Sequence, residues 1–255
     1  MKQLDLSGRT ALVFGGVGNL GVRIASKLRE HDANVAISYY NGEENKAASY
    51  VKELDSDGEK AFTAFCDISD ESSVEGFVRS SKDRFRTIDI VVNLIHEPAF
   101  TPTEVVDMVW DDWKSDLIAQ KGHFLICKQV LPIMREQKFG RIIYISAGLA
   151  VRHMGGSAAF ACVKSGLSTF SKTLAIEEGR NNITVNIVAP GRITTLDTDG
   201  SFSWDEAEKE LLKRTPLGRF ATQDDVANAV LYFASPLADA MTGQTLYVAC
   251  GEIML

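Results

Sequence analysis

The stretch Ala11-Leu12-Val13-Phe14-Gly15-Gly16-Val17-Gly18-Asn19-Leu20-Gly21 joins a short apolar run to a glycine-rich segment. The apolar run predicts a buried strand, and the small residues after it predict a tight turn that opens a helix. Such a turn lets the backbone approach a pyrophosphate, which the free N–H groups and dipole of the helix N-terminus stabilise. Tight turns also use glycine for steric reasons alone. The stretch therefore predicts a strand, turn and helix that can bind a nucleotide.

Short β-branched runs alternate with longer amphipathic stretches along the rest of the chain. This pattern predicts an α/β fold: a single doubly wound parallel sheet of the Rossmann type, with about seven strands and helices on both faces. The predicted strands are Thr10–Phe14, Asn34–Tyr39, Ala61–Cys66, Ile88–Asn93, Arg141–Ser146, Thr184–Val188 and Thr245–Val248. Helices are predicted to begin near Leu20, Glu43, Glu71, Glu104, Gly156 and Asp224, with a further short helix at Glu206–Lys213.

Composition narrows the class of protein. The 255 residues carry 45% apolar residues, 24% charged residues and a formal net charge of −7. We expect a single domain over 1–255, with a polar lid near 194–215 over a small-molecule substrate. The negative charge argues against nucleic acid and anionic membranes as partners, and no apolar run predicts a membrane span. The four cysteines lack Cys-x-x-Cys spacing, which predicts no metal site and reduced thiols in a cytoplasmic setting.

A second motif lies at Ser157-Ala158-Ala159-Phe160-Ala161-Cys162-Val163-Lys164. It closely resembles the Tyr-x-x-x-Lys signature of the short-chain dehydrogenase/reductase family, with Phe160 at the tyrosine position. The glycine-rich turn resembles the family's Thr-Gly-x-x-x-Gly-x-Gly turn, with Phe14 in place of the Thr and Asn19 in place of the middle Gly. Further matches at Asn93, Val185–Thr195 and Thr242–Leu246 extend the resemblance over nearly the whole chain.

The resemblance implies a nicotinamide cofactor and a set of residues that hold it. We favour NADP over NAD because the end of the second predicted strand, Ser38-Tyr39-Tyr40-Asn41, lacks the carboxylate that binds a ribose 2′-OH. The predicted cofactor-binding residues are Gly15, Val17, Gly18, Asn19, Leu20, Gly21, Ser38, Tyr39, Asn41, Asp67, Ile68, Asn93, Lys164, Pro190, Gly191, Ile193 and Thr195.

The catalytic positions implied by the resemblance are mostly altered. In a typical member a Tyr protonates the substrate carbonyl, a Lys lowers the pKa of that Tyr, a Ser steadies the substrate oxygen and an Asn organises a proton-relaying water. Here only Lys164 remains, because Phe160 has no hydroxyl, Ala147 occupies the Ser position and Ala119 the Asn position. A one-residue shift in the alignment could return the Ser role to Ser146, but no shift restores the Tyr.

Three explanations stay open. Hydride added to an iminium carbon, or to a conjugated enone or enoyl group, does not require that phenol. Alternatively another acid replaces it, with His96 and His153 as the candidates that titrate near neutral pH, beside Arg152, Ser157 and Cys162. In the third case the chain is an inactive nucleotide-binding or partner-binding module.

The apolar helices predicted at Val105–Val130 and Ser157–Ile176 resemble the pair through which the family forms homodimers and homotetramers.

Overall fold

Seven parallel strands form one sheet in a computed structural model of the chain, which describes residues 4–95, 101–194 and 206–254. The strand order is β3-β2-β1-β4-β5-β6-β7. Their bounds are β1 (Thr10–Phe14), β2 (Asn34–Tyr39), β3 (Ala61–Phe65), β4 (Ile90–Asn93), β5 (Gly140–Ile145), β6 (Ile183–Pro190) and β7 (Thr245–Val248). The strands β1, β2 and β3 are added toward one edge of the sheet, and the chain then returns to place β4 on the other side of β1. The carboxyl ends of β1 and β4 therefore flank a crevice.

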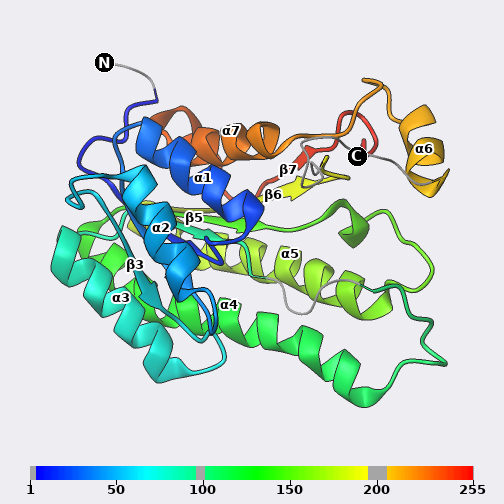
Figure 1. Cartoon of the computed structure of the whole chain (residues 1–255), viewed down its shortest axis with the longest axis horizontal. Helices are drawn as coiled ribbons and strands as arrows, with labels where there is room; N and C mark the ends of the chain where they lie inside the picture. Colours follow the sequence, from blue (N-terminus) through cyan, green and yellow to red (C-terminus); the bar gives the residue numbers. More distant parts are fainter. Residues whose placement is uncertain (1–3, 96–100, 195–205, 255) are drawn as a thin grey trace.

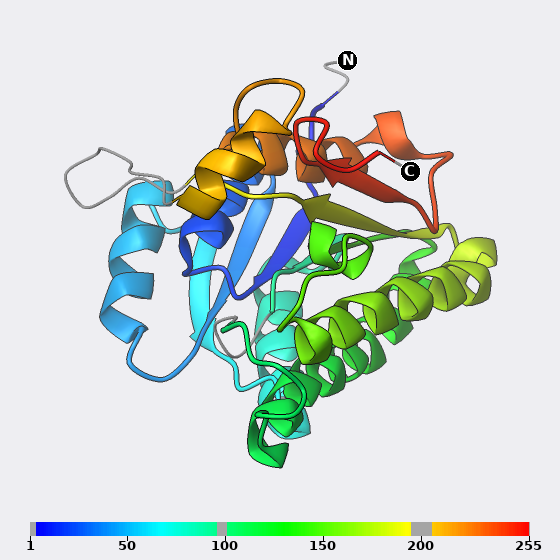
Figure 2. The same cartoon turned by 90° about the vertical axis from the view of Figure 1, so that its right-hand side faces the viewer.

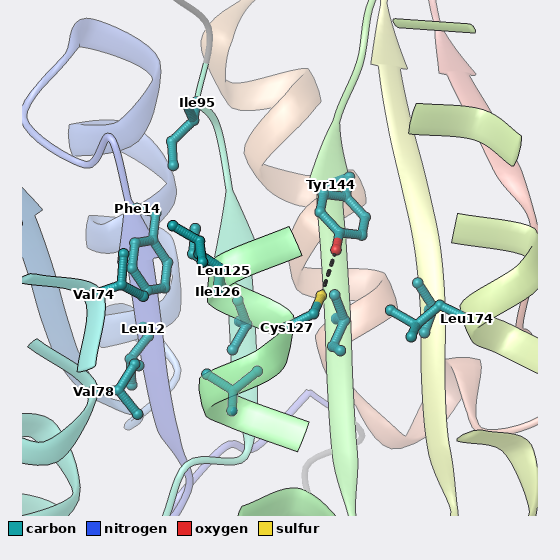
Figure 3. Packing of buried hydrophobic residues seen from close by; sticks show 14 of the residues in the cluster. Leu12, Phe14, Val74, Val78, Ile95, Leu125, Ile126, Cys127, Tyr144 and Leu174 are labelled. Carbon is teal, nitrogen blue, oxygen red and sulfur yellow. Dashed lines mark hydrogen bonds between the residues drawn. The ribbon is translucent and has the colours of Figure 1, made fainter. Parts of the chain in front are cut away.

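Helices cover both faces of the sheet, so the predicted fold class is confirmed (Figures 1 and 2). Residues of α1 (Asn19–Glu30), α2 (Glu44–Leu54) and α7 (Gln223–Ala234) pack in the apolar core on one face. Those of α3 (Glu71–Phe85), α4 (Trp110–Gln137) and α5 (Ala158–Glu178) pack in the core on the other. Figure 3 shows this second core, in which α4 residues such as Leu125 and Ile126 lie against the sheet. The remaining helix, α6 (Glu206–Lys213), has the bounds that the sequence predicts.

The elements form where the sequence pattern predicts them, with two instructive differences. Strand ends shift by one or two residues, and β5 stops at Ile145, one residue before Ser146. The start predicted for the fourth helix, near Glu104, is wrong, because α4 begins at Trp110. Val105, Val106 and Val109 are β-branched and disfavour helix. The Thr103 N–H also donates to the Gly156 carbonyl at 3.0 Å, which ties this segment to the loop before α5 instead.

Candidate active site

A cavity of about 530 Å³ opens beside the glycine-rich turn, at the carboxyl ends of the strands. Its lining includes nine of the predicted cofactor-binding residues: Gly15, Gly18, Asn19, Leu20, Gly21, Ser38, Tyr39, Asp67 and Ile68. The other predicted residues lie elsewhere. Val17 is buried in the apolar core and Asn41 is exposed. Pro190 is the last residue of β6, and Gly191 and Ile193 follow it. Thr195 and His96 lie outside the described residues.

Gly15 and Gly18 determine the shape of the turn. Gly15 has a φ of +74°, in the region that favours glycine, and its N–H donates to Ser38 Oγ at 3.0 Å. The N-cap residue of α1, Gly18, supplies no side-chain capping bond, so free N–H groups of the first helical turn face the cavity. This arrangement fits the pyrophosphate of a dinucleotide.

Gly21→Ala is expected to weaken dinucleotide binding at least tenfold, because backbone atoms surround this position. A Cβ there would lie 2.6 Å from both Gly15 O and Gly16 Cα, so the turn would have to open at a cost of about 1–3 kcal/mol. Gly18→Ala is the matched control, since its Cβ would meet only Gly15 O, at 3.8 Å. Titration of NADPH fluorescence measures both variants. Equal affinities in the two would contradict the role given to the turn.

Eight further residues line the cavity and were not among the predicted cofactor-binding residues. Tyr40, Cys66, Ser69, Leu94 and Ile95 each neighbour a predicted residue or strand end, so extending those predictions would have found them. The other three are Glu43 before α2, Ile118 in α4 and Ile145 in β5, where the local pattern indicates only core packing or exposure to solvent.

Two of the predicted cofactor-binding residues have further contacts. Asp67 Oδ1 accepts from Ser69 N and Oγ, and Ile68 packs so closely on Gly122 that a Cβ there would lie 3.0 Å from Ile68 Cδ1.

Lys164 lies deep beside this cavity. Its side chain is buried, and Nζ donates to the carbonyl of Ile145, a residue that also lines the cavity, at 3.3 Å. One helical turn earlier on α5, the Phe160 ring has its centroid 5.7 Å from Nζ. Burial lowers the pKa of Lys164 to about 8, and the nearby charge of Asp116 partly opposes this effect. The lysine predicted to be catalytic is therefore buried beside a ring without a hydroxyl.

The remaining catalytic candidates are dispersed. Ala147 is the N-cap residue of the short 3-10 helix η1 (Gly148–Ala150). Ser146 is buried and, with Ala147, lines a separate cavity of about 150 Å³ whose walls come from α5, β6 and β7, and Lys164 is not among its lining residues. The His153 side chain is exposed after η1, where its neighbour Arg152 forms an ion pair with buried Glu252 at 2.7 Å. Neither alternative places a new acid in contact with Lys164.

Two titratable residues of α4 that were not predicted as site residues, Asp116 and His123, interact electrostatically with Lys164. Asp116 is half-buried, and burial raises the pKa of its carboxyl while the Lys164 charge opposes this. His123 is buried, and burial together with the Lys164 charge lowers the pKa of its imidazole to about 3. Asp116 and His123 are seven residues apart, which is two helical turns, so they share the face that also carries Ala119. The sequence contained a signal for these residues, because Asp116 and His123 lie on the same helix face on either side of Ala119, the position of the family's asparagine.

The chain is similar to known proteins over almost its whole length. A family model described as enoyl-(acyl carrier protein) reductase matches residues 16–252. The chain is 34% identical over 247 residues to the 3-oxoacyl-[acyl-carrier-protein] reductase FabG of Chlamydia muridarum, covering 96% of this chain and 98% of that protein. The chain belongs to the short-chain dehydrogenase/reductase family. The prediction of an NAD(P)-dependent oxidoreductase is thereby confirmed.

Other members of the short-chain dehydrogenase/reductase family are similar over the same length. Subunit BbsD of the (2S)-[(R)-hydroxy(phenyl)methyl]succinyl-CoA dehydrogenase of Thauera aromatica is 35% identical over 254 residues, with 98% of each chain covered. A gluconate 5-dehydrogenase from Burkholderia cenocepacia, solved in complex with NADP and tartrate, superimposes with a TM-score of 0.89 at 28% identity. That match covers 98% of this chain and 97% of the other.

Within the described residues, no helix is both long and apolar enough to cross a membrane. The same part of the chain contains no group of three or more His, Cys, Asp or Glu side chains arranged to hold a metal ion.

Proposed function

We propose that this protein is an NADP(H)-dependent reductase that transfers hydride without a phenolic acid, to an iminium carbon or to a conjugated carbonyl compound. The observation that carries the proposal is the pairing of buried Lys164 with the Phe160 ring, one helical turn apart beside the cofactor cavity. A ketone reductase needs a proton donor at this place, and general acid catalysis there is typically worth ~10²–10⁴ in rate. The description of the matching family model, an enoyl reductase, supports a conjugated acceptor.

The residues present account for each part of such a reaction. A bound nicotinamide cofactor supplies the hydride. The turn at Gly15–Gly21 would hold the pyrophosphate, and Asp67 and Ile68, which also line the cavity, would form the wall for the adenine. Lys164 would hold the nicotinamide ribose, and its positive charge near the reacting atoms would stabilise an enolate of the substrate. Hydride addition to an iminium carbon leaves a neutral amine, so it needs no further acid.

Support for NADP comes from two sides. The gluconate dehydrogenase neighbour binds NADP, and Ser38, Tyr39, Tyr40 and Asn41 offer no carboxylate to a ribose 2′-OH. Glu43, however, lines the same cavity, with its Oε2 accepting from Tyr40 N–H at 2.9 Å. Its negative charge opposes a 2′-phosphate and so reduces the preference for NADP that the rest of the site provides.

Glu43→Gln is therefore expected to tighten NADP binding about three- to tenfold while leaving NAD binding nearly unchanged. The glutamine keeps an oxygen acceptor for the Tyr40 N–H but removes the like charge. Glu44→Gln is the control, because Glu44 is the next residue, is exposed and does not line the cavity. Calorimetric titration with both cofactors gives the ratio. An equal change for NAD and NADP would show that Glu43 lies away from the 2′-phosphate.

We extend the proposal to the organisation of the whole chain. Residues 1–255 form one dinucleotide-binding domain, and 194–215 act as a lid, of which α6 is the described part. Exposed apolar side chains on α4 and α5, among them Leu117, Phe124 and Ile176, support a homodimer or homotetramer built through these helices. The net charge of −7 and the family relationship support a cytoplasmic enzyme that acts on a small molecule.

The proposed reaction is tested in two steps. NADPH titration by fluorescence first establishes binding, and the protein is then assayed with NADPH on panels of ketones, imines and conjugated enones or enoyl thioesters. Turnover of imines or enones with little turnover of ketones is the expected result. Tight NADPH binding without turnover on any panel would instead indicate a nucleotide-binding or partner-binding module. Ketone turnover at rates typical of the family would overturn the proposal outright.

A further inference from the structure

The C-terminal segment after β7 packs against the loop that leads from β5 to α5. Glu252 forms an ion pair with Arg152 of that loop, with Oε1 at 2.7 Å from Nη1. The next residue, Ile253, covers Gly148 so closely that its side chain leaves no room for a Cβ there. In Figure 2 this segment, drawn in red, lies near the green turn of η1. Two consecutive residues therefore fix the end of the chain to the β5–α5 loop.

The Glu252 carboxylate also contacts the segment that follows β6. Its Oε2 accepts from the Arg192 N–H at 3.4 Å, and it lies so close to Gly191 that a Cβ there would be 2.6 Å away. The same segment is bound to a second neighbour, because the Thr194 N–H donates to the Ala221 carbonyl at 2.8 Å. Residues 191–194 are thus held by Glu252 and by Ala221.

Glu252 is a buried carboxylate, since its side chain is 4% exposed, against 39% for Arg152. Burying a carboxylate is costly unless an opposite charge and a hydrogen-bond donor compensate it, and such a pair adds little net stability to a fold. What the pair can supply is one defined geometry, because the guanidinium and the Arg192 N–H must both be in place. Glu252 therefore joins the β5–α5 loop to the segment after β6 in a single arrangement.

Both connections lie at one end of the cofactor cavity. The strand order places the carboxyl ends of β5 and β6 next to each other, and those of β2 and β3 on the opposite side of β1. Asp67 lines the cavity just after β3, whereas Ile145, whose carbonyl accepts from Lys164, lines it at β5. A dinucleotide with its adenine at Asp67 would therefore extend its nicotinamide toward the segment after β6, which contains Ile193.

We propose that Glu252 is a positioning residue for the nicotinamide half of the cofactor site. Through Arg152 it fixes the loop between β5 and α5, and through the Arg192 N–H it fixes the segment after β6, so both are in place before the cofactor binds. The Arg192 side chain pairs with Glu208 of α6, which extends the connection to the proposed lid. The inference rests on the proposed function only in that the cavity binds NADPH.

The test compares the affinities of two ligands by calorimetric titration. NADPH occupies the whole site, whereas 2′,5′-ADP carries only the adenine half of the cofactor. Glu252→Gln removes the charge, and we expect NADPH affinity to fall about three- to tenfold while 2′,5′-ADP affinity is unchanged. Arg152→Met is expected to have the same effect, and the double variant to add little to it. Arg152→Lys keeps a charge for the single contact of Nη1 and is expected to stay near wild type.

Glu178→Gln is the matched control, because Glu178 is also a buried carboxylate, 0% exposed, and is paired with the half-exposed Arg135. Glu178 ends α5 and does not line the cavity. Its loss is expected to lower the free energy of unfolding without changing the ratio of the two affinities. The ratio therefore separates a positioning role from a merely structural one.

An equal fall for both ligands in Glu252→Gln, or no fall for either, overturns the positioning role. If Glu252→Gln does not fold, the comparison of Arg152→Met with Arg152→Lys decides the matter, since Arg152 is partly exposed. Equal NADPH affinities in those two variants would then overturn it. Wild-type protein that binds neither ligand would overturn the proposed function as well, whereas NADPH binding without turnover would overturn the proposed reaction alone.

Discussion

Phe160→Tyr is expected to raise the rate of NADPH-dependent ketone reduction by ~10²–10⁴, the usual contribution of a positioned general acid. The new hydroxyl would extend from a ring whose centroid now lies 5.7 Å from Lys164 Nζ. The buried ammonium would lower the phenol pKa from its usual value near 10, which brings it closer to the assay pH. Steady-state assay on the ketone panel, followed by the loss of NADPH absorbance, measures the gain.

Two companion variants sharpen this test. Phe160→Tyr combined with Ala147→Ser also supplies the substrate-oxygen donor, and we expect a further gain over the single variant. Phe139→Tyr adds the same hydroxyl directly before β5, at the edge of the sheet away from the cavity, and should leave ketone reduction unchanged. If neither Phe160 variant reduces ketones although both bind NADPH as tightly as wild type, the Phe160 ring does not occupy the place of the family's catalytic tyrosine.

Lys164→Met is expected to have two opposite effects, a loss of hydride transfer of at least ~10² and a gain in stability at pH 7. The stability gain follows from the pKa of Lys164, which burial lowers from 10.5 to about 8. Below pH 8 the folded protein bears the full cost of burying the charge, on the order of 3 kcal/mol for this pKa difference. The cost shrinks as the pH rises from 8 to 10.5, because there the unfolded chain binds more protons than the folded one. The advantage of methionine is therefore largest at neutral pH and disappears above about pH 10.5.

Urea denaturation of both proteins at pH 7 and at pH 10 measures this difference. The control is Lys172→Met on the same helix, where the side chain is exposed and the free energy of unfolding should change by less than about 0.5 kcal/mol. A Lys164→Met variant that is less stable than wild type at pH 7 would show that the ammonium is better satisfied in the folded protein than its surroundings indicate. Unchanged turnover in that variant would remove Lys164 from the reaction.

The local sequence predicted most of the fold correctly because the relevant signals are local. Apolar runs marked β1, β2 and β7 with identical bounds, and the glycines after Phe14 marked the turn before α1. The start of α4 was wrong, since the valines at 105, 106 and 109 compete with helix formation and a hydrogen bond from Thr103 to Gly156 draws the segment elsewhere. That bond joins residues 53 positions apart, which no local pattern records.

The sequence by itself determined the sheet, the glycine turn and the pairing of Phe160 with Lys164, because each depends on residues within one or two turns or strands of one another. Only the tertiary structure decided which side chains surround the Lys164 ammonium. Asp116 and His123 interact with its charge from a different helix, and Ile145 and Glu43 come to the cavity wall from β5 and from the start of α2. Burial and charge act through space, so the state of a lysine depends on which groups the fold brings next to it and how much water it leaves there.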